Sequence, residues 1–327
     1  MKSKNNENPV RTTTLEVVSR AKDVVINKEK IKEVAETWIK EGVSSPCWLY
    51  DMHYVSKDEE TMLTYYILLD SLNFCFWPSS HKKKKWYIVH ERKQYNGYFG
   101  LSLTLRKFFE TQKEKANFEY LKSISYKEFV SLLGGKGDLQ LTRERSAIVR
   151  GVSEVICKKY KGSAIRFVES SNRKLSVLIP KIAQELPSFN DVAYAGSKKI
   201  YLWKRAQILG LDIYGAFEGK GKGYFEDPEY ATAFPDYKLP QILRFWGIFE
   251  YSKSLAKRVD EEKLIKPGSR EEIEIRSATV WAVEYLRDEL KKYGRNFHAY
   301  EVDWILWNKS QEIKLDKPYH HTKTVFY

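Results

Sequence analysis

The chain has 327 residues, of which 43% are hydrophobic and 30% are charged, so it is too apolar to be disordered beyond a short tail. Its formal net charge of +13 points to one of two partners, nucleic acid or a small phosphorylated ligand. Three cysteines without metal or disulfide spacing, and no apolar run near the roughly 20 residues that span a bilayer, predict a cytoplasmic protein without membrane contact.

Helical spacing of apolar residues dominates the chain after a polar start. Residues 1–12 are predicted to be a disordered tail, and residues 13–327 a single helical domain. The β-rich stretch "WYIVHE" lies between a basic run and "YNGY", and it predicts a small β-hairpin insertion around residues 75–96. The predicted helices cover residues 27–42, 59–74, 97–110, 142–160, 173–186, 198–217, 269–294 and 299–307, with two more beginning at about 125 and 239.

Local signals mark several helix ends. Asn27 is expected to cap the first predicted helix, and Gly42 to stop it. Pro180 lies inside a helical pattern and should kink that helix. Capping boxes are predicted at Ser125 with Glu128 and at Ser269 with Glu272. Because no βαβ alternation occurs, a doubly wound sheet is excluded, and the fold class is mainly α with a small β insertion.

The stretch "FPDYKLPQ" holds one acid, Asp236, on a stiff turn. Pro235 and Pro240 restrict the backbone on both sides, and Pro240 suits the first turn of the helix that follows. A carboxylate at a helix N-terminus is favoured in its ionised form. Asp236 is therefore either a helix cap or a catalytic acid, and this stretch alone favours the cap.

Two further stretches suit a flat heterocyclic ligand. Asp303 lies among apolar residues in "YEVDWILW", where a buried carboxylate needs donors from the protein or from a ligand. Asn73 in "LNFCFWP" precedes aromatic residues, and rings that stack together with an amide that reads an edge would fit such a ligand. The alternatives are a satisfied core acid and an ordinary core helix end.

Cations in apolar surroundings point to an anion. Lys204 and Arg205 are adjacent in "WKRAQILG", and with Lys238 they could bind one phosphate, although ordinary surface charge explains them too. The stretch "GKGKGYF" lacks the spacing of a phosphate-binding loop, and the histidines show no metal-ligand spacing. No metal and no cofactor is therefore expected.

Taken together, these stretches resemble one family, the queuosine salvage proteins, which are queuosine 5′-phosphate N-glycosylase/hydrolases. The matching pieces run from about residue 70 to the C-terminus, with His53 upstream. They are "DSLNFCFW", "YNGYFGL", "WKRAQIL", "FPDYKLPQ", "AYEVDWILW" and "PYHHTKTVFY". The resemblance implies hydrolysis of the N-glycosidic bond of queuosine 5′-monophosphate with release of queuine, and an architecture like that of helical DNA glycosylases.

The resemblance also implies residue roles. The acid at position 236 is the catalytic residue of the family motif, and Asp303 contacts the base. His53 and Phe234 are carried over as pocket residues. This chain departs from the family pattern at Pro235, where alanine is usual, at Asn308, where an acid is expected near the base, and at His321, where arginine is expected.

The expected mechanism needs an ionised carboxylate close to the ribose, because N-glycoside cleavage builds positive charge there. The base is expected between the side chains of His53, Asn73, Phe74, Phe76, Trp77, Phe234, Asp303 and Asn308. The 5′-phosphate is expected at Lys204, Arg205, Tyr237 and Lys238. The partners are thus a small nucleotide and its product queuine, and no direct contact with nucleic acid is expected. Two alternatives are a base glycosylase that binds nucleic acid and a queuine-binding protein without activity.

Overall fold

The computed structural model describes residues 7–327, and within them α-helices make up most of the regular structure. The helices are α1 (Pro9–Val18), α2 (Lys28–Glu41), α3 (Glu59–Ser71), α4 (Gly97–Thr111), α5 (Phe118–Leu121), α6 (Tyr126–Leu133), α7 (Thr142–Tyr160), α8 (Ala164–Glu169), α9 (Leu175–Glu185), α10 (Lys204–Ala216), α11 (Lys238–Phe245), α12 (Lys253–Asp260), α13 (Arg270–Lys292) and α14 (Ala299–Glu312). The strands are β1 (Val24–Ile26), β2 (Tyr87–His90), β3 (Lys93–Asn96), β4 (Val192–Ala195), β5 (Lys198–Tyr201) and β6 (Phe249–Tyr251).

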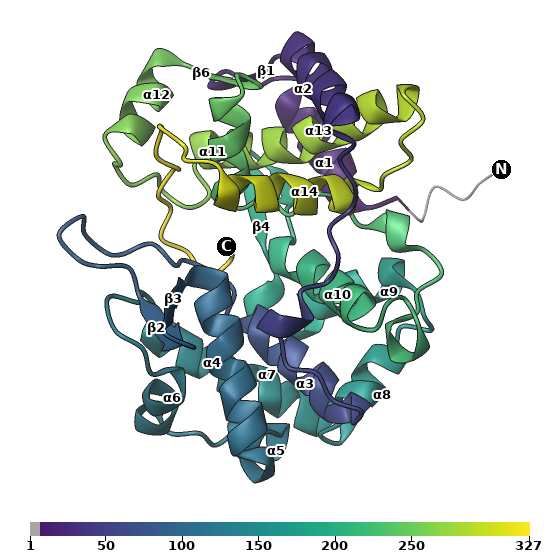
Figure 1. Cartoon of the computed structure of the whole chain (residues 1–327), viewed down its shortest axis with the longest axis vertical. Coiled ribbons are helices and arrows are strands. Elements are labelled where there is room, and N and C mark those ends of the chain that lie inside the picture. Colours follow the sequence, from purple (N-terminus) through teal and green to yellow (C-terminus); the bar gives the residue numbers. More distant parts are fainter. Residues whose placement is uncertain (1–6) are drawn as a thin grey trace.

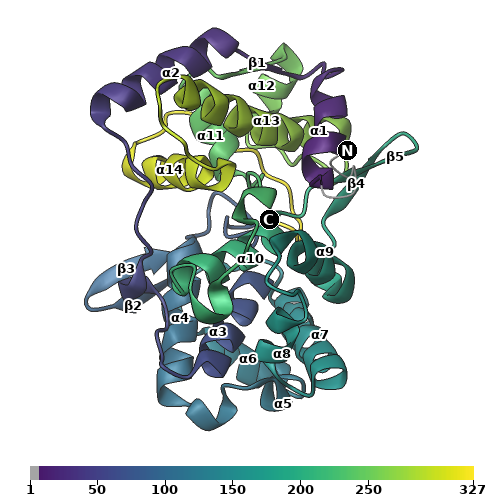
Figure 2. The same ribbon diagram turned by 90° about the vertical axis from the view of Figure 1, so that its right-hand side faces the viewer.

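The elements gather in two lobes, with α10 between them (Figures 1 and 2). One lobe holds α1, α2 and α11 to α14, and the other holds α3 to α9. The strands form three separate antiparallel pairs, β1 with β6, β2 with β3 and β4 with β5. The mainly α fold class predicted from the sequence is confirmed. The comparison with DNA glycosylases stays a prediction.

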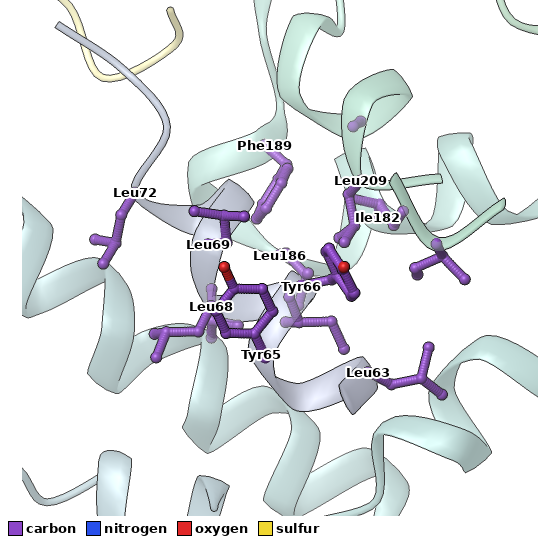
Figure 3. Close-up of a cluster of buried hydrophobic side chains, with 14 of the residues drawn as sticks. Leu63, Tyr65, Tyr66, Leu68, Leu69, Leu72, Ile182, Leu186, Phe189 and Leu209 are labelled. Carbon is purple, nitrogen blue, oxygen red and sulfur yellow. The ribbon is translucent and has the colours of Figure 1, made fainter. Parts of the chain in front are cut away.

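Helix α3 forms the centre of the larger core. Its residues from Met62 to Ser71 are all buried, as its uniformly apolar sequence predicts. Tyr65, Tyr66 and Leu69 lie among side chains of α9 and α10 and of the turn after α9 (Figure 3). Burial of a large apolar side chain contributes about 1.5–3 kcal/mol, so this helix anchors the lobe.

Helix α13 plays the same part in the other lobe. It packs against α1, α2, α11 and α14, and apolar residues such as Ile275, Val283 and Leu286 are buried there. The short strand pair β1 and β6 joins the N-terminal region to the segment after α11, with Val25 opposite Glu250. Helix α2 therefore shares a core with the C-terminal third of the chain, and α1 packs on α13 beside it.

Several predicted helix ends are confirmed. The Asn27 side chain accepts the Lys30 N–H at the start of α2, and Gly42 ends that helix at φ 65°. The predicted box at the start of α6 is present in both directions. At α13 only the Ser269 half forms, because the Glu272 carboxylate accepts the Gly268 N–H instead. Pro180 lies inside α9, and the kink expected there stays a prediction.

Two predictions need correction. Residues 1–6 of the expected tail lie outside the described residues, but α1 begins at Pro9, where Asn8 caps it by accepting the Val10 N–H. The stretch 198–217 is not one helix, since residues 198–201 pair with β4 as a hairpin and α10 begins only at Lys204. The apolar spacing there concealed a hairpin that turns at Gly196, which has φ 64°. The division into domains is not tested, although the pair β2–β3 lies within the range expected for an insertion.

None of the helices within residues 7–327 combines the length and the apolar character that a membrane crossing requires.

Candidate active site

A cavity of about 360 Å³ draws its walls from both lobes and from α10. It has the size of a small-ligand site. Most of the side chains predicted to form the site line it. They are His53, Asn73, Phe76, Lys204, Phe234, Asp236, Tyr237, Lys238, Asp303 and Asn308, together with Phe74.

Asp236 serves as a helix cap and also lines the cavity. Its Oδ1 atom accepts the backbone N–H groups of Lys238 (2.8 Å) and Leu239 (2.9 Å) at the start of α11. Its Oδ2 atom has no hydrogen-bond partner within residues 7–327. Burial raises the pKa of this carboxyl, and the nearby Lys204 ammonium and the two N–H groups oppose that rise. One oxygen is thus held in place while the other remains free for a ligand.

Buried Arg276 of α13 fixes the turn that carries Asp236. Its Nε–H donates to the Pro235 carbonyl (2.9 Å), and its two terminal nitrogens donate to the Asp191 carboxylate (2.9 and 2.5 Å). Asp191 also accepts the backbone N–H of Lys204 (3.2 Å). One ion pair therefore ties α13, the start of α10 and the Pro235 turn together.

Asp303 of α14 is 2% exposed, and its Oδ2 atom accepts the Phe234 backbone N–H at 2.7 Å. Burial raises its pKa well above the ordinary value, and the nearby Asp236 carboxylate adds to that rise. The bond also positions Phe234, two residues before Asp236. The two acids of the sequence analysis therefore meet in one cavity.

Lys204 is the cation shared by several buried acids. Its ammonium donates to the Asn73 carbonyl (3.2 Å), and it acts electrostatically on Asp70, Asp212, Asp236 and Asp303. Burial lowers the pKa of Lys204, and the carboxylates counter that effect. Its contacts are those of a counter-ion for carboxylates more than those of a dedicated phosphate ligand.

A hydrogen-bonded chain runs along another wall. His53 Nδ1 lies 2.7 Å from the Leu49 carbonyl oxygen, and His53 Nε2 lies 2.8 Å from the Tyr98 hydroxyl. That hydroxyl lies 3.2 Å from Oδ2 of Asp212, which is 4% exposed. Burial lowers the pKa of His53 to about 4, and it raises the pKa of Asp212 well above the ordinary value. All three side chains line the cavity.

Two further cations, Lys85 and Lys238, line the cavity near Tyr319. Their ammonium groups lie 5.4 and 5.7 Å from the centre of the Tyr319 ring. Lys238 also donates to the Gln241 side chain (3.0 Å). Burial lowers the pKa of Lys238, the nearby Asp236 carboxylate raises it, and the charge of Lys85 adds to the lowering. Two like charges this close favour a bound anion between them.

Aromatic rings form much of the remaining wall. Trp48 lies against His53 with ring centres 4.9 Å apart, and against Trp304 at 6.3 Å. Trp307 of α14 contacts Tyr98 edge-on at 6.0 Å, so it joins α14 to α4. Such rings supply flat apolar surface at which a base can stack.

Two predicted site residues do not line the cavity. The guanidinium of Arg205 is buried and donates to the carbonyls of Asp70, Ser71 and Ser188, so its donors support the backbone instead of a phosphate. Trp77 stacks on His321 at 4.4 Å with the rings nearly parallel, outside the cavity-lining set. Adjacent residues on a helix face different sides, which is why Lys204 points into the cavity while Arg205 points to the backbone carbonyls.

Sequence reasoning missed Lys85, Tyr98, Asp212 and Tyr319. Lys85 belongs to the basic run before "WYIVHE", which the sequence analysis does not connect with the site. Asp212 did carry a signal, because Lys204, Ile208 and Asp212 recur every four residues and all line the cavity. Within residues 7–327, no group of three or more His, Cys, Asp and Glu side chains is arranged to hold a metal ion.

Comparisons with known proteins agree on one family. A family model described as queuosine salvage protein matches residues 52–327. A protein of Sphaerobacter thermophilus is 36% identical over 97% of this chain and 97% of its own length. Proteins of Dictyostelium discoideum (34%; 97% and 98%) and Mus musculus (30%; 95% and 96%) are similar too. All three are named queuosine 5′-phosphate N-glycosylase/hydrolase.

Proposed function

Because this chain belongs to the queuosine salvage protein family, we propose that it uses Asp236 for the activity named for its relatives, hydrolysis of the N-glycosidic bond of queuosine 5′-phosphate with release of the base queuine. As this bond breaks, positive charge develops on the ribose C1′ and ring oxygen. The ionised Asp236 carboxylate stabilises that charge, either through space or by forming a transient bond to C1′.

The observation that carries this proposal is the setting of Asp236. Its Oδ1 atom is held by two backbone N–H groups, while its Oδ2 atom is free of hydrogen bonds within residues 7–327. The Pro235 carbonyl before it is held by Arg276. A carboxylate that is fixed before substrate binds loses little energy to reorganisation, which is the condition for electrostatic catalysis.

The base and the phosphate of the nucleotide are assigned to side chains of matching chemistry. Asp303 accepts hydrogen bonds from the N–H edge of the base, and His53, Phe76, Phe234 and Asn308 enclose it. Lys238 and Lys85 bind the 5′-phosphate beside Tyr319 and Tyr237, while Lys204 balances the charge of the acids. Phosphate binding at a distance from C1′ orients the sugar for the reaction. The cavity volume of about 360 Å³ suits a free nucleotide, so the proposed substrate is the monophosphate and not an intact RNA.

The three cysteines form no disulfide, which fits a reducing compartment, and we propose that the reaction takes place in the cytoplasm.

The experiment is Asp236→Asn, with base release followed by chromatography and nucleotide binding by calorimetry. The rate of base release should fall on the order of 10²–10³-fold with little change in affinity, because the amide keeps the shape but not the charge.

Asp227→Asn is the matched control. Asp227 also accepts helix N–H groups, those of Leu175 (2.6 Å) and Ser176 (3.1 Å), but it lies outside the cavity. Its replacement should leave the rate unchanged. Turnover by Asp236→Asn at the wild-type rate would exclude Asp236 from the chemistry. An equal loss of rate in Asp227→Asn would mean that Asp236 acts only as a helix cap.

A further inference from the structure

The leaving base raises a problem that Asp236 does not solve. This inference rests on the proposed function. The base of queuosine is a 7-deazaguanine, which has carbon in place of N7, so it cannot take up a proton there as it departs. The electron pair of the broken C1′–N bond must still be neutralised. The site therefore needs a group that holds a proton before the reaction and can give it up.

Counting hydrogens along the chain from His53 identifies such a group. The Leu49 carbonyl can only accept, so Nδ1 of His53 carries a hydrogen. Burial lowers the pKa of His53 to about 4, so the ring is neutral at pH 7, Nε2 presents a lone pair and the Tyr98 hydroxyl donates to it. Tyr98 has one hydrogen and has now used it. If Asp212 were ionised, Tyr98 would have to give that hydrogen to Oδ2 (3.2 Å) and would leave Nε2 of His53 without a donor, whereas a protonated Asp212 donates to Tyr98 and satisfies both contacts.

The charges around Asp212 agree with this count. The groups facing it are Asp70, Tyr65 and Tyr66 of α3, Tyr98 of α4 and Lys204 of its own helix. Burial raises the pKa of Asp212 most and the charge of Asp70 raises it further, whereas the contact with the Tyr98 hydroxyl and the charge of Lys204 oppose that rise. That single ammonium is already shared with Asp236 and Asp303. Arg205 also acts on Asp70, and Lys238 also acts on Asp236, whereas the cation acting on Asp212 within residues 7–327 is the shared Lys204. A proton on Asp212 therefore relieves its repulsion with Asp70.

Asp212 is also within reach of a ligand. It lines the cavity, and its Oδ1 atom has no hydrogen-bond partner within residues 7–327. Lys204, Ile208 and Asp212 form one face of α10, about 12 Å long at 1.5 Å per residue. This face runs from Lys204, which interacts electrostatically with Asp236, to Asp212, which contacts His53 through Tyr98. The base is expected beside His53.

We propose that Asp212 is the general acid that protonates the departing base. The C1′–N bond breaks with its electron pair remaining on the base, and the Asp212 proton is transferred to the base. Asp236 stabilises the positive ribose. Water then adds its oxygen to C1′, and the proton it releases restores Asp212. The His53–Tyr98 chain keeps Asp212 in its protonated form between turnovers.

The test compares two substrates with the variant Asp212→Asn, whose amide can still donate to Tyr98. Base release from queuosine 5′-monophosphate should slow by about a hundredfold, the usual contribution of a general acid. Release of 4-nitrophenolate from 4-nitrophenyl β-D-ribofuranoside 5-phosphate should fall by no more than about threefold, because that group leaves as a stable anion. The decline of kcat/KM at high pH should disappear in the variant.

The variant Asp236→Asn separates this inference from the proposed function, since it should slow the hydrolysis of both substrates. Equal losses with both substrates in Asp212→Asn, or no loss with either, would overturn the role of Asp212. Infrared difference spectra give a readout independent of activity. A protonated-carboxyl band present at pH 7 in the wild-type protein should be missing from Asp212→Asn, and wild-type spectra that show no such difference would refute the proton count.

Discussion

At the scale of single residues, Asp236 combines the two roles, helix cap and catalytic acid, that the sequence analysis offered as alternatives. A cap needs a carboxylate oxygen on helix N–H groups, and a catalyst needs a carboxylate oxygen facing the substrate. In the proposed function the two oxygens of Asp236 meet these needs separately, since only Oδ1 is used at α11. The capping bonds lower the freedom of the side chain, and they favour its ionised form.

The phosphate assignment is also tested residue by residue. Lys238→Met and Lys85→Met should each raise KM for queuosine 5′-monophosphate roughly tenfold to a hundredfold, the range of one hydrogen bond to a charged group. The dephosphorylated nucleoside should be hydrolysed equally well by wild-type protein and by both variants, as measured by kcat/KM.

Lys84→Met provides the control for Lys85, because Lys84 is its exposed neighbour and does not line the cavity. An unchanged KM for the monophosphate in both cavity variants would contradict the assignment.

At the scale of elements, α10 links the two ends of the cavity, and a glycine near its end sets one wall. A Cβ atom added at Gly215 would lie 2.5 Å from Cε3 and 2.9 Å from Cζ3 of Trp48. Such distances force the indole to move, and it lies 4.9 Å from the ring of His53. The close approach of α10 to Trp48 therefore requires glycine.

We expect Gly215→Ala to raise KM for the monophosphate. The clash with Trp48 should also offset the stability that alanine adds through its higher helix propensity. Gly151→Ala in α7 is the control, since nothing lies within 4 Å of a Cβ added there. That variant should be more stable by about 0.5–1 kcal/mol in urea unfolding, with unchanged KM. A Gly215→Ala protein with the KM of the wild type would show that Trp48 does not shape the site.

At the scale of the whole molecule, buried histidines couple stability to pH. His320 is 1% exposed, with Nε2 3.2 Å from the Tyr327 hydroxyl and Nδ1 without a partner within residues 7–327. Burial, with Arg276 and His321 nearby, lowers its pKa to about 3. Unfolding returns the pKa to about 6.5. The unfolded chain therefore binds a proton that the folded chain does not, and this histidine reduces stability as the pH falls below 6.5.

The variant His320→Gln should not show this loss of stability at low pH. Between pH 7.5 and 5.0, the free energy of unfolding of the variant should improve relative to wild type by roughly 2 kcal/mol, from about 1.4 kcal/mol per unit of pKa difference. Urea unfolding at both pH values measures this change. His90→Gln, at a half-exposed position on β2, is the control and should show no such trend. A difference between variant and wild type that stays constant with pH would mean that His320 is not held neutral by the fold.

The sequence by itself determined the helical class, most helix ends and the capping role of Asp236. These depend on residues within a few positions of one another: Asn27 caps α2 three residues ahead of the N–H that it accepts, and Asp236 does the same at α11. The family motifs further predicted site roles for both acids, because Asp236 and Asp303 occupy defined places in them, and both line the cavity.

Only the tertiary structure decided which side chains share the cavity. Its walls come from segments between residues 46 and 327, and the direction of each side chain depends on how distant helices pack. Arg205 turned to backbone carbonyls while Lys204, one residue earlier, turned to the acids. Asp212 gained its hydrogen-bond partner, Tyr98, from α4, and through Tyr98 a link to His53, both far away in the chain. Burial and the distances between charges exist only after folding, and they decide which carboxyls keep their protons.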